Sequence, residues 1–413
     1  SFVITRTARK TTLRLEYCTD VVSASTADAM IGAWSRALAT LLKGKLSGKQ
    51  QSQLNDETSN DSSEGAVADP AYLAEVLTLF KHYLGEFVNE KDDFFLSGGH
   101  SLLAIRILNE LGKLYDKHLP SYLIFEGRTA NNIAVSLKEI IEPGAGHRVS
   151  GVARLTQNPE GQNIWFIHPA GGALWCYKDL AERVLAGNLS SYGIECVPEA
   201  STGQFVSNLN TMAERYCLDI LDRDQSQYYT IVGYSFGGNV AYEICRLLSQ
   251  KYDKRCRLVL LDSHICAVKP FSRDDFALSY ATKFTEGKPH LLDKTKLYLS
   301  DGSVNFSYIK SIGVGTGHIT ADTPLPDIES GLRMWLANNE AVHSHDPVGV
   351  FKGECLFIRA TRNPSDSTSG WEKHLTDMKR VEIDAGHFDI YKPPATQMVA
   401  EHIVAFVNRE FSA

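Results

Sequence analysis

Two rhythms of hydrophobic and polar positions alternate along this chain of 413 residues. Over residues 152–413, short apolar runs typical of strands are separated by stretches with helical spacing. This alternation predicts an α/β domain, a mostly parallel sheet with helices on both faces. The expected strands cover residues 164–167, 192–197, 228–232, 257–261, 354–359 and 380–383.

The α/β rhythm breaks off between about residues 266 and 350, where two helix-like stretches flank a segment rich in Gly, Thr and Pro. A long insertion between strands at the active-site end of such a sheet is typically a lid. We expect its large apolar side chains either to line a pocket or to pack the lid on the core; they include Phe276, Tyr280, Phe284, Trp335 and Leu336.

Residues 69–141 have helical spacing instead. A first helix is expected after Asp69, a capping residue followed by Pro70 at the first helical position. Further helices are expected over residues 101–115 and about 129–141. We therefore predict a small four-helix-bundle domain. The apolar stripe of its first helix is formed by Leu73, Val76, Leu77, Phe80 and Leu84.

The remaining segments are two linkers and a small N-terminal piece. Residues 43–68 are polar and have almost no aliphatic side chains, so we expect a flexible linker. Residues 142–151, rich in Gly and Pro, are a second linker. Residues 1–42 contain β-like runs over 2–5 and 13–17 and an amphipathic helix, and are too few to bury their own faces.

Charge and cysteine usage narrow the possible functions. The net charge of -7 gives no basic field for nucleic acid or anionic lipid, and no apolar run is long enough for a membrane span. The eight cysteines are scattered within apolar segments, which favours reduced thiols and a cytoplasmic protein. The chain opens with Ser1 and not with methionine, so we expect it to be a piece of something longer.

The clearest chemical signal is the pentapeptide Gly-Tyr-Ser-Phe-Gly at residues 233–237. It follows an apolar strand and precedes a helix-like segment, which is the setting of a nucleophile held at a sharp turn. The glycines remove Cβ atoms that would crowd that turn. Ser235 is therefore the candidate nucleophile.

A serine hydroxyl needs an imidazole base and an acid that orients it. His387, in a Gly-His-Phe loop after the last expected strand, is the candidate base. Two acids are possible: Asp262 ends a strand next to the nucleophile strand, and Asp366 lies in a later Ser/Asp/Pro loop. We favour Asp262, because a carboxylate at a strand end is fixed more rigidly than one in a loop.

An acyl-transfer site also needs donors for its oxyanion. We expect the backbone N–H groups of Phe236, directly after the nucleophile, and of Ala170, in the loop His-Pro-Ala-Gly-Gly at residues 168–172. His168 is expected to brace this loop. The sequence His-Ser-His-Asp at residues 343–346 resembles a metal cluster, but no further His or Cys ligand stands near it, so we expect no metal.

In the helical bundle, residues 93–102 read Asp-Phe-Phe-Leu-Ser-Gly-Gly-His-Ser-Leu, which sets Ser101 at the start of a helix. A helix N-terminus suits a phosphodiester on that serine. An ordinary N-cap serine would look the same.

These motifs carry a resemblance to nonribosomal peptide synthetases. Residues 69–141 resemble their peptidyl carrier (thiolation) domains through the aromatic pair, Gly-Gly and Ser-Leu of residues 94–102. Residues 152–413 resemble their terminal type I thioesterase, an α/β-hydrolase, through residues 168–172, 233–238, 261–262 and 386–387. In that family the acid follows the sixth strand, which supports Asp262.

The resemblance implies a cofactor and partners. Ser101 would carry covalent phosphopantetheine, installed by a phosphopantetheinyl transferase, and upstream synthetase modules would supply a peptidyl thioester. Residues 1–42 are similar to the C-terminal end of a condensation domain, although the His-His motif of that family is absent. The adenylation domain that usually stands between condensation and carrier domains is absent as well.

We therefore expect release of the peptide through Ser235, by macrocyclisation or by hydrolysis, between which the motifs do not choose. One alternative is a catalytically silent carrier and interaction module. Another is an editing thioesterase that removes misprimed acyl groups.

Overall fold

The computed structural model describes residues 2–6, 11–15, 68–115, 117, 119–142, 150–199, 202–265, 276–286, 289–321, 323–347, 349–362 and 370–409. The chain divides into two compact units, Ser1–Ala66 and Val67–Ala413. In the first unit, β1 (Phe2–Arg6) and β2 (Thr11–Leu15) pair as antiparallel strands, with Phe2 opposite Leu15. The helix expected in residues 1–42 lies outside the described residues.

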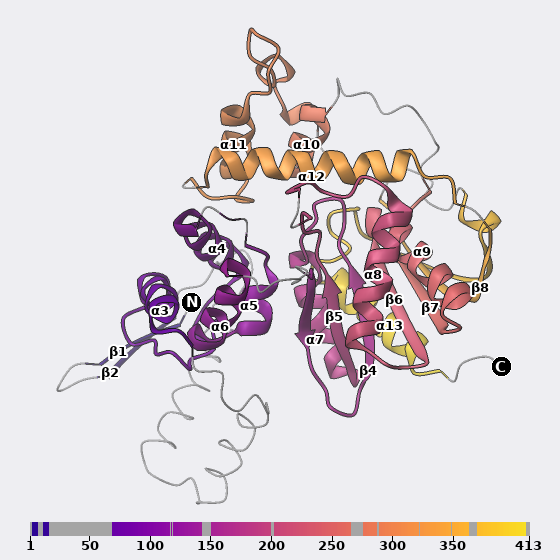
Figure 1. Cartoon of the computed structure of the whole chain (residues 1–413), viewed down its shortest axis with the longest axis horizontal. Coiled ribbons are helices and arrows are strands. Elements are labelled where there is room, and N and C mark those ends of the chain that lie inside the picture. Colours follow the sequence, from indigo (N-terminus) through magenta and orange to yellow (C-terminus); the bar gives the residue numbers. More distant parts are fainter. Residues whose placement is uncertain are drawn as a thin grey trace, which may run out of the picture. The chain divides into compact units, whose positions relative to one another are not determined.

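The second unit begins with a four-helix bundle, as predicted. Its helices are α3 (Pro70–Leu84), α4 (Ser101–Tyr115), α5 (Tyr122–Gly127) and α6 (Ala130–Ile141), drawn in indigo to purple in Figure 1. Asp69 caps α3 by accepting from the Ala71 amide, with Pro70 at the first helical position. The core between the helices includes Phe80, whose ring lies 5.4 Å from that of Phe94. The short helix α5 was not located from sequence.

The predicted α/β fold is confirmed by a seven-stranded sheet in the order β3-β5-β4-β6-β7-β8-β9, in which only the edge pair β3–β5 is antiparallel. Its strands are β3 (Val152–Thr156), β4 (Gln162–Ile167), β5 (Leu189–Ile194), β6 (Tyr228–Tyr234), β7 (Arg255–Leu261), β8 (Phe351–Ala360) and β9 (Leu375–Ile383).

The sheet differs from the prediction most clearly at three strands. The edge strand β3 was not expected, β5 covers residues 189–194 in place of 192–197, and β9 covers residues 375–383 in place of 380–383. The start of β5 was missed because it contains Ser190 and Ser191, and serine side chains are usually exposed. Their hydroxyls are hydrogen-bonded, Ser190 to the Asn158 carbonyl and Ser191 to the Thr156 hydroxyl, so both fit the interior.

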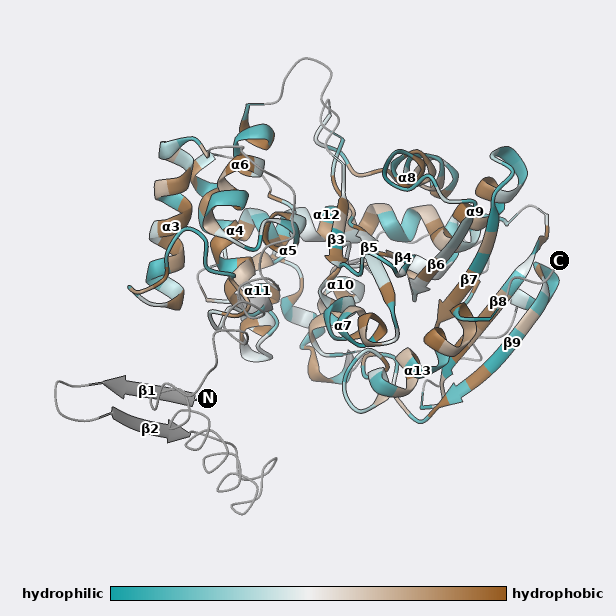
Figure 2. Cartoon of the chain, turned by 90° about the horizontal axis from the view of Figure 1, so that it is seen from below, coloured by the Kyte–Doolittle hydropathy of each residue, from teal (hydrophilic) through white to brown (hydrophobic). Residues whose placement is uncertain are grey.

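Helices cover both faces of the sheet (Figures 1 and 2). On β4, Trp165 and Ile167 pack with α8 (Leu209–Arg223) and α9 (Phe236–Lys251). Ile164 and Phe166 point to the other face, where they join α7 (Lys178–Ala186) and α13 (Ala395–Val407). Successive side chains are thus buried on opposite faces, which explains the nearly continuous apolar strands in the sequence.

The expected lid contains α10 (Phe276–Phe284), α11 (Phe306–Gly315) and α12 (Leu325–His343), which lie together in Figure 1. These helices share a small apolar core of their own, formed by Ala277, Tyr280, Ala281, Phe284, Leu292, Leu297, Ile309, Ile328 and Leu332. The long helix α12 also reaches the core of the α/β domain through Ala341 and Val342.

Contacts between α5 and β3 join the helical bundle to the α/β domain within the second unit. Oε2 of Glu195 accepts hydrogen bonds from the Ser121 and Tyr122 amides at the start of α5. The ring of Phe125 lies 4.6 Å from that of Trp175. None of the helices in the described ranges has the length and apolarity needed to cross a bilayer.

Candidate active site

Ser235 lies between the end of β6 at Tyr234 and the start of α9 at Phe236. Its backbone has φ 55° and ψ -124°, a conformation that is costly for a residue with a side chain. The Ser235 amide donates to the Leu261 carbonyl at 3.0 Å, which ties the turn to the neighbouring strand. The sharp strand-to-helix turn expected for a nucleophile is therefore present at this serine.

The glycines of the pentapeptide are required by close backbone contacts. A Cβ atom on Gly233 would lie 2.2 Å from the Gly237 carbonyl oxygen, and one on Gly237 would lie 2.5 Å from that of Ile167. Gly238 packs equally closely against Ser263, because its Cβ would lie 2.2 Å from the Ser263 hydroxyl oxygen. Any larger residue at these positions would push the turn away from the sheet.

His387 and Asp262 are brought together although they are separated by 125 residues. Nδ1 of His387 lies 2.7 Å from Oδ2 of Asp262, and the other carboxylate oxygen of Asp262 accepts from the Ala360 amide at 3.0 Å. Asp262 is fully buried directly after β7. The alternative acid, Asp366, lies outside the described residues.

Two tyrosines hold this arrangement in place, and sequence reasoning missed both. The Tyr234 hydroxyl donates to the His387 carbonyl at 2.8 Å, while the Tyr234 amide donates to the Tyr177 hydroxyl at 2.8 Å. Tyr177 in turn donates to the Ile167 carbonyl. Tyr234, the residue directly before Ser235, thus anchors the loop that contains His387. No sequence motif indicates this role.

The two residues expected to supply the oxyanion donors are Phe236, directly after Ser235, and Ala170, which lines the same cavity as Ser235. Phe236 is the first residue of α9, so its amide belongs to the free N–H groups of a helix N-terminus. Ala170 lies in the loop after β4, and its carbonyl accepts from Nδ2 of Asn338 at 2.9 Å. Asn338, fully buried on α12, was not anticipated, because its partner lies 168 residues away in sequence.

His168 braces the same loop. Its Nδ1 lies 2.8 Å from the Pro169 carbonyl oxygen and its Nε2 lies 2.8 Å from the Tyr216 hydroxyl. Burial lowers the pKa of His168 to about 4, although the Pro169 carbonyl acts in the opposite direction. A neutral imidazole that donates to Pro169 and accepts from Tyr216 satisfies both contacts.

The sequence at residues 343–346 forms no metal cluster. Nε2 of His345 lies 3.0 Å from Oε1 of Glu243, a fully buried residue of α9. In the described part of the chain, no three His, Cys, Asp or Glu side chains are grouped closely enough to hold a metal ion. His345 therefore connects the end of the lid to α9.

Ser101 is the first residue of α4, a helix of 15 residues whose first turn has no acidic side chain. Gly98 has φ 95°, and a Cβ atom on Gly99 would lie 2.5 Å from the Phe94 ring, so both glycines are needed in the approach to Ser101. A serine hydroxyl at an N-terminus free of carboxylates fits the attachment of a phosphodiester.

Two family models match the segments that contain Ser101 and Ser235. The model described as a phosphopantetheine attachment site matches residues 74–135, and the model described as a thioesterase domain matches residues 162–275. The chain is a carrier domain followed by a thioesterase domain. Their order is that of the C-terminal end of nonribosomal peptide synthetases.

Similar curated proteins are nonribosomal peptide synthetases. A dimodular synthase of Bacillus subtilis is 24% identical over 73% of this chain, and enterobactin synthase component F of Escherichia coli O157:H7 is 27% identical over 81%. The matches cover 12% and 24% of those relatives, so the chain spans a quarter of their length or less. A solved four-domain nonribosomal peptide synthetase shares the fold, with a TM-score of 0.58 and 23% identity over 85% of this chain and 27% of its own.

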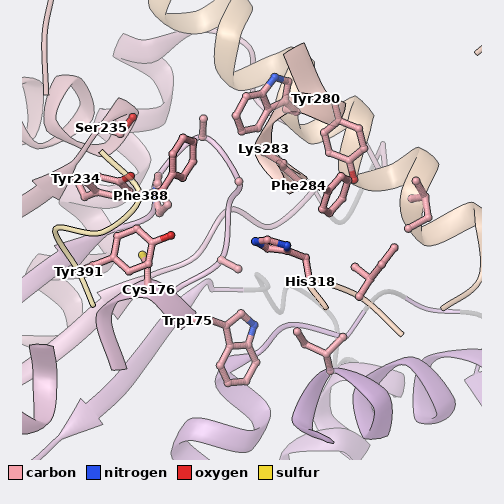
Figure 3. A pocket seen from close by; sticks show the side chains of 18 of the residues that line it. Trp175, Cys176, Tyr234, Ser235, Tyr280, Lys283, Phe284, His318, Phe388 and Tyr391 are labelled. Atoms are coloured by element: carbon pink, nitrogen blue, oxygen red, sulfur yellow. The ribbon is translucent and has the colours of Figure 1, made fainter. Parts of the chain in front are cut away.

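A cavity of about 400 Å³ opens at Ser235. Both Ser235 and His387 line it, and so do Ile105 and Asn109 of the carrier helix α4. Figure 3 shows Tyr234, Ser235 and Phe388 on one side and the lid residues Tyr280, Phe284 and His318 on the other. The cavity is mostly apolar, so it suits a chain that must be kept from water. Of the two alternatives left open for the lid side chains, lining the cavity holds for Tyr280, Phe284 and Trp335, whereas Leu336 packs against the lid core. The side chain of Phe276 lies outside the described residues.

Proposed function

We propose that this chain releases a peptidyl thioester from its carrier domain through a serine nucleophile in its thioesterase domain. The observation that supports this most directly is the pairing of His387 with buried Asp262 at the rim of the cavity that Ser235 lines. A silent module would not need a strained serine beside an oriented imidazole.

Ser101 is proposed as the attachment residue of phosphopantetheine in the carrier domain. When bound there, the group supplies the thiol that holds the peptide as a thioester. The modification requires a phosphopantetheinyl transferase as a partner, and the peptide requires upstream synthetase modules with their condensation domain.

In the first half-reaction, Ser235 Oγ attacks the acyl carbonyl carbon and His387 takes the serine proton. The C–O bond to Ser235 forms and the C–S bond breaks, and His387 returns the proton to the departing sulfur. Asp262 accepts the Nδ1–H of His387, so that Nε2 is left free to take the serine proton.

The developing oxyanion is proposed to accept hydrogen bonds from the amides of Phe236 and Ala170. Both are fixed before the reaction, one by the start of α9 and one by the loop that Asn338 and His168 hold. Donors that need no reorganisation stabilise the transition state most.

In the second half-reaction, His387 removes a proton from the attacking group and gives it to Oγ of Ser235 as the ester bond breaks. The attacking group is water for hydrolysis, or an amine or hydroxyl of the same peptide for macrocyclisation. A lidded apolar cavity favours cyclisation to the extent that it keeps water from the ester.

We also propose that the protein acts in the cytoplasm. The thiols of Cys176, Cys196, Cys217, Cys245, Cys256 and Cys355 are free, as expected in a reducing compartment.

The test is to load the chain from a synthetic peptidyl-coenzyme A with a permissive phosphopantetheinyl transferase and to weigh protein and product by mass spectrometry. Release with the free acid mass indicates hydrolysis, and a product lighter by one water indicates a cyclase. Ser101→Ala is expected to prevent loading, and Ser235→Ala to leave the loaded protein intact. Equal release by Ser235→Ala and the unaltered chain would contradict the proposal.

A further inference from the structure

Lys283, on the lid helix α10, lines the cavity next to aromatic side chains. Its Nζ lies 4.1 Å from the ring centre of Tyr280, 4.8 Å from that of Phe284 and 5.8 Å from that of Trp335. Figure 3 shows Lys283 close to Tyr280 and Phe284 on the lid side of the cavity. The ammonium group is therefore held at a defined place in the lid wall.

In the described part of the chain, no carboxylate lies within ion-pairing distance of the Lys283 ammonium group, and burial lowers the pKa of Lys283 to about 7. Two lid acids have interactions elsewhere. Glu286 pairs with Lys392, and Asp327, which lines the same cavity, adds to burial in raising the pKa of the Tyr280 hydroxyl. His318 also lines the cavity; burial, with smaller contributions from Lys392 and Lys283, lowers its pKa, and an imidazole supplies no negative charge in either protonation state.

The Lys283 side chain is half-buried. A cation that is partly removed from water without a counter-ion is costly, and contacts with aromatic faces offset only part of the cost. A ligand with a negative charge would supply the counter-ion that the lysine needs. Here the ligand would be the acyl chain, because Lys283 and Ser235 line one cavity.

We propose that Lys283 binds a carboxylate side chain of the peptide while its acyl carbon is at Ser235. The inference rests on the proposed function and adds a substrate class to it: peptides with an Asp-like or Glu-like residue at one distance from the thioester. The ion pair restores the charge of the lysine, fixes the register of the chain in the cavity and lets the aromatic rings pack against the stem of the acidic residue.

The test compares pairs of peptidyl substrates that differ only by Glu or Gln, with that residue moved one position at a time away from the thioester. For the unaltered chain we expect kcat/KM for the Glu peptide to exceed that for the Gln peptide by about tenfold or more at one position. Lys283→Met is expected to abolish this preference and Lys283→Arg to keep part of it. Lys294→Met, which removes an exposed lid lysine, is the matched control and should change nothing.

Several results would overturn the inference. Equal release of Glu and Gln peptides at every position by the unaltered chain would do so without any variant. A preference that persists in Lys283→Met would do so as well. An equal loss for both peptides in Lys283→Met would point to the lid fold or to the phosphate of the carrier arm instead. If no peptide is released at all, the proposed function fails rather than the role of Lys283.

Discussion

At the scale of single residues, the chemistry depends on side chains that the fold holds in costly states. Ser235 has a positive φ, Asp262 is a buried carboxylate that also has a positive φ, and His168 is a buried imidazole. Each is stabilised by specific neighbours. Conservative substitutions of these residues should therefore change the reaction rate or the pH dependence of stability much more than they change the fold.

Asp262→Asn is the most conservative test of the acid. The amide would present its N–H group to Nδ1 of His387 and favour the wrong tautomer, so we expect kcat for release to fall by about 10³ to 10⁴-fold. Release kinetics with a loaded carrier would measure this. Asp384→Asn, an exposed change in the loop before His387, is the control; a similar fall in both variants would show a general effect of the loop.

Because His168 is buried as a neutral imidazole, the folded chain should lose stability in acid. The folded chain holds this imidazole neutral down to a pKa of about 4, whereas the unfolded chain binds the proton near its ordinary value of 6.5. Stability from this group is therefore complete above pH 6.5 and falls as the pH falls towards 4. Between pH 7 and pH 5 we expect His168→Gln to lose about 2 kcal/mol less of the free energy of unfolding than the unaltered chain.

Urea unfolding at the two pH values measures this difference. The expectation would be wrong if both chains lost stability to the same extent.

At the scale of elements, much of the fold could be predicted because strand and helix rhythms are local. The bundle helices, the nucleophile turn between β6 and α9, and the lid follow from apolar spacing, glycines and capping residues. The start of β5 could not be predicted, since Ser190 and Ser191 look exposed until their hydrogen-bond partners are known. The edge strand β3 has too little apolar sequence of its own to stand out.

The candidate site likewise contains residues that could be predicted from the sequence and residues that could not. The sequence alone brings out Ser235, His387 and two possible acids, because these residues follow strands in an expected order. Tyr177 and Asn338 could not be found, because they act on backbone atoms far away in sequence, such as the Ala170 carbonyl. Long-range polar contacts to the backbone leave no pattern in a single sequence.

The helix α12 and the loop of Ala170 form one such long-range pair. Asn338→Ala would leave the Ala170 carbonyl without its donor and loosen the amide proposed for the oxyanion. We expect kcat to fall about tenfold with little change in KM. Asn339→Ala, the neighbouring change that removes only a bond to the Trp335 carbonyl, is the control. A change confined to KM would argue for a role in substrate binding instead.

At the scale of the whole molecule, carrier and thioesterase belong to one chain, and release should be intramolecular. The loaded chain is expected to release product with a first-order rate that stays constant over a hundredfold dilution. In a mixture of the loaded Ser235→Ala chain with the Ser101→Ala chain, release would require an encounter between two chains. At about 1 μM it should be roughly 10³-fold slower, since tethering gives an effective concentration near the millimolar range.

Quenched-flow mass spectrometry at several protein concentrations would distinguish the two cases. A rate that rises with concentration in the unaltered chain would show that the carrier is served by another molecule.

The long helix α12 has a consequence for engineering. Its first half packs in the lid core through Ile328 and Leu332, and its second half is embedded in the hydrolase core through Ala341 and Val342. It is therefore a fixed wall, and variation in the size of the cavity is left to α10 and to the segment after α11 that contains His318, Ile319 and Thr323. A chimaera that exchanges lids between related enzymes should keep α12 with the recipient and place its junctions on either side of residues 276–323.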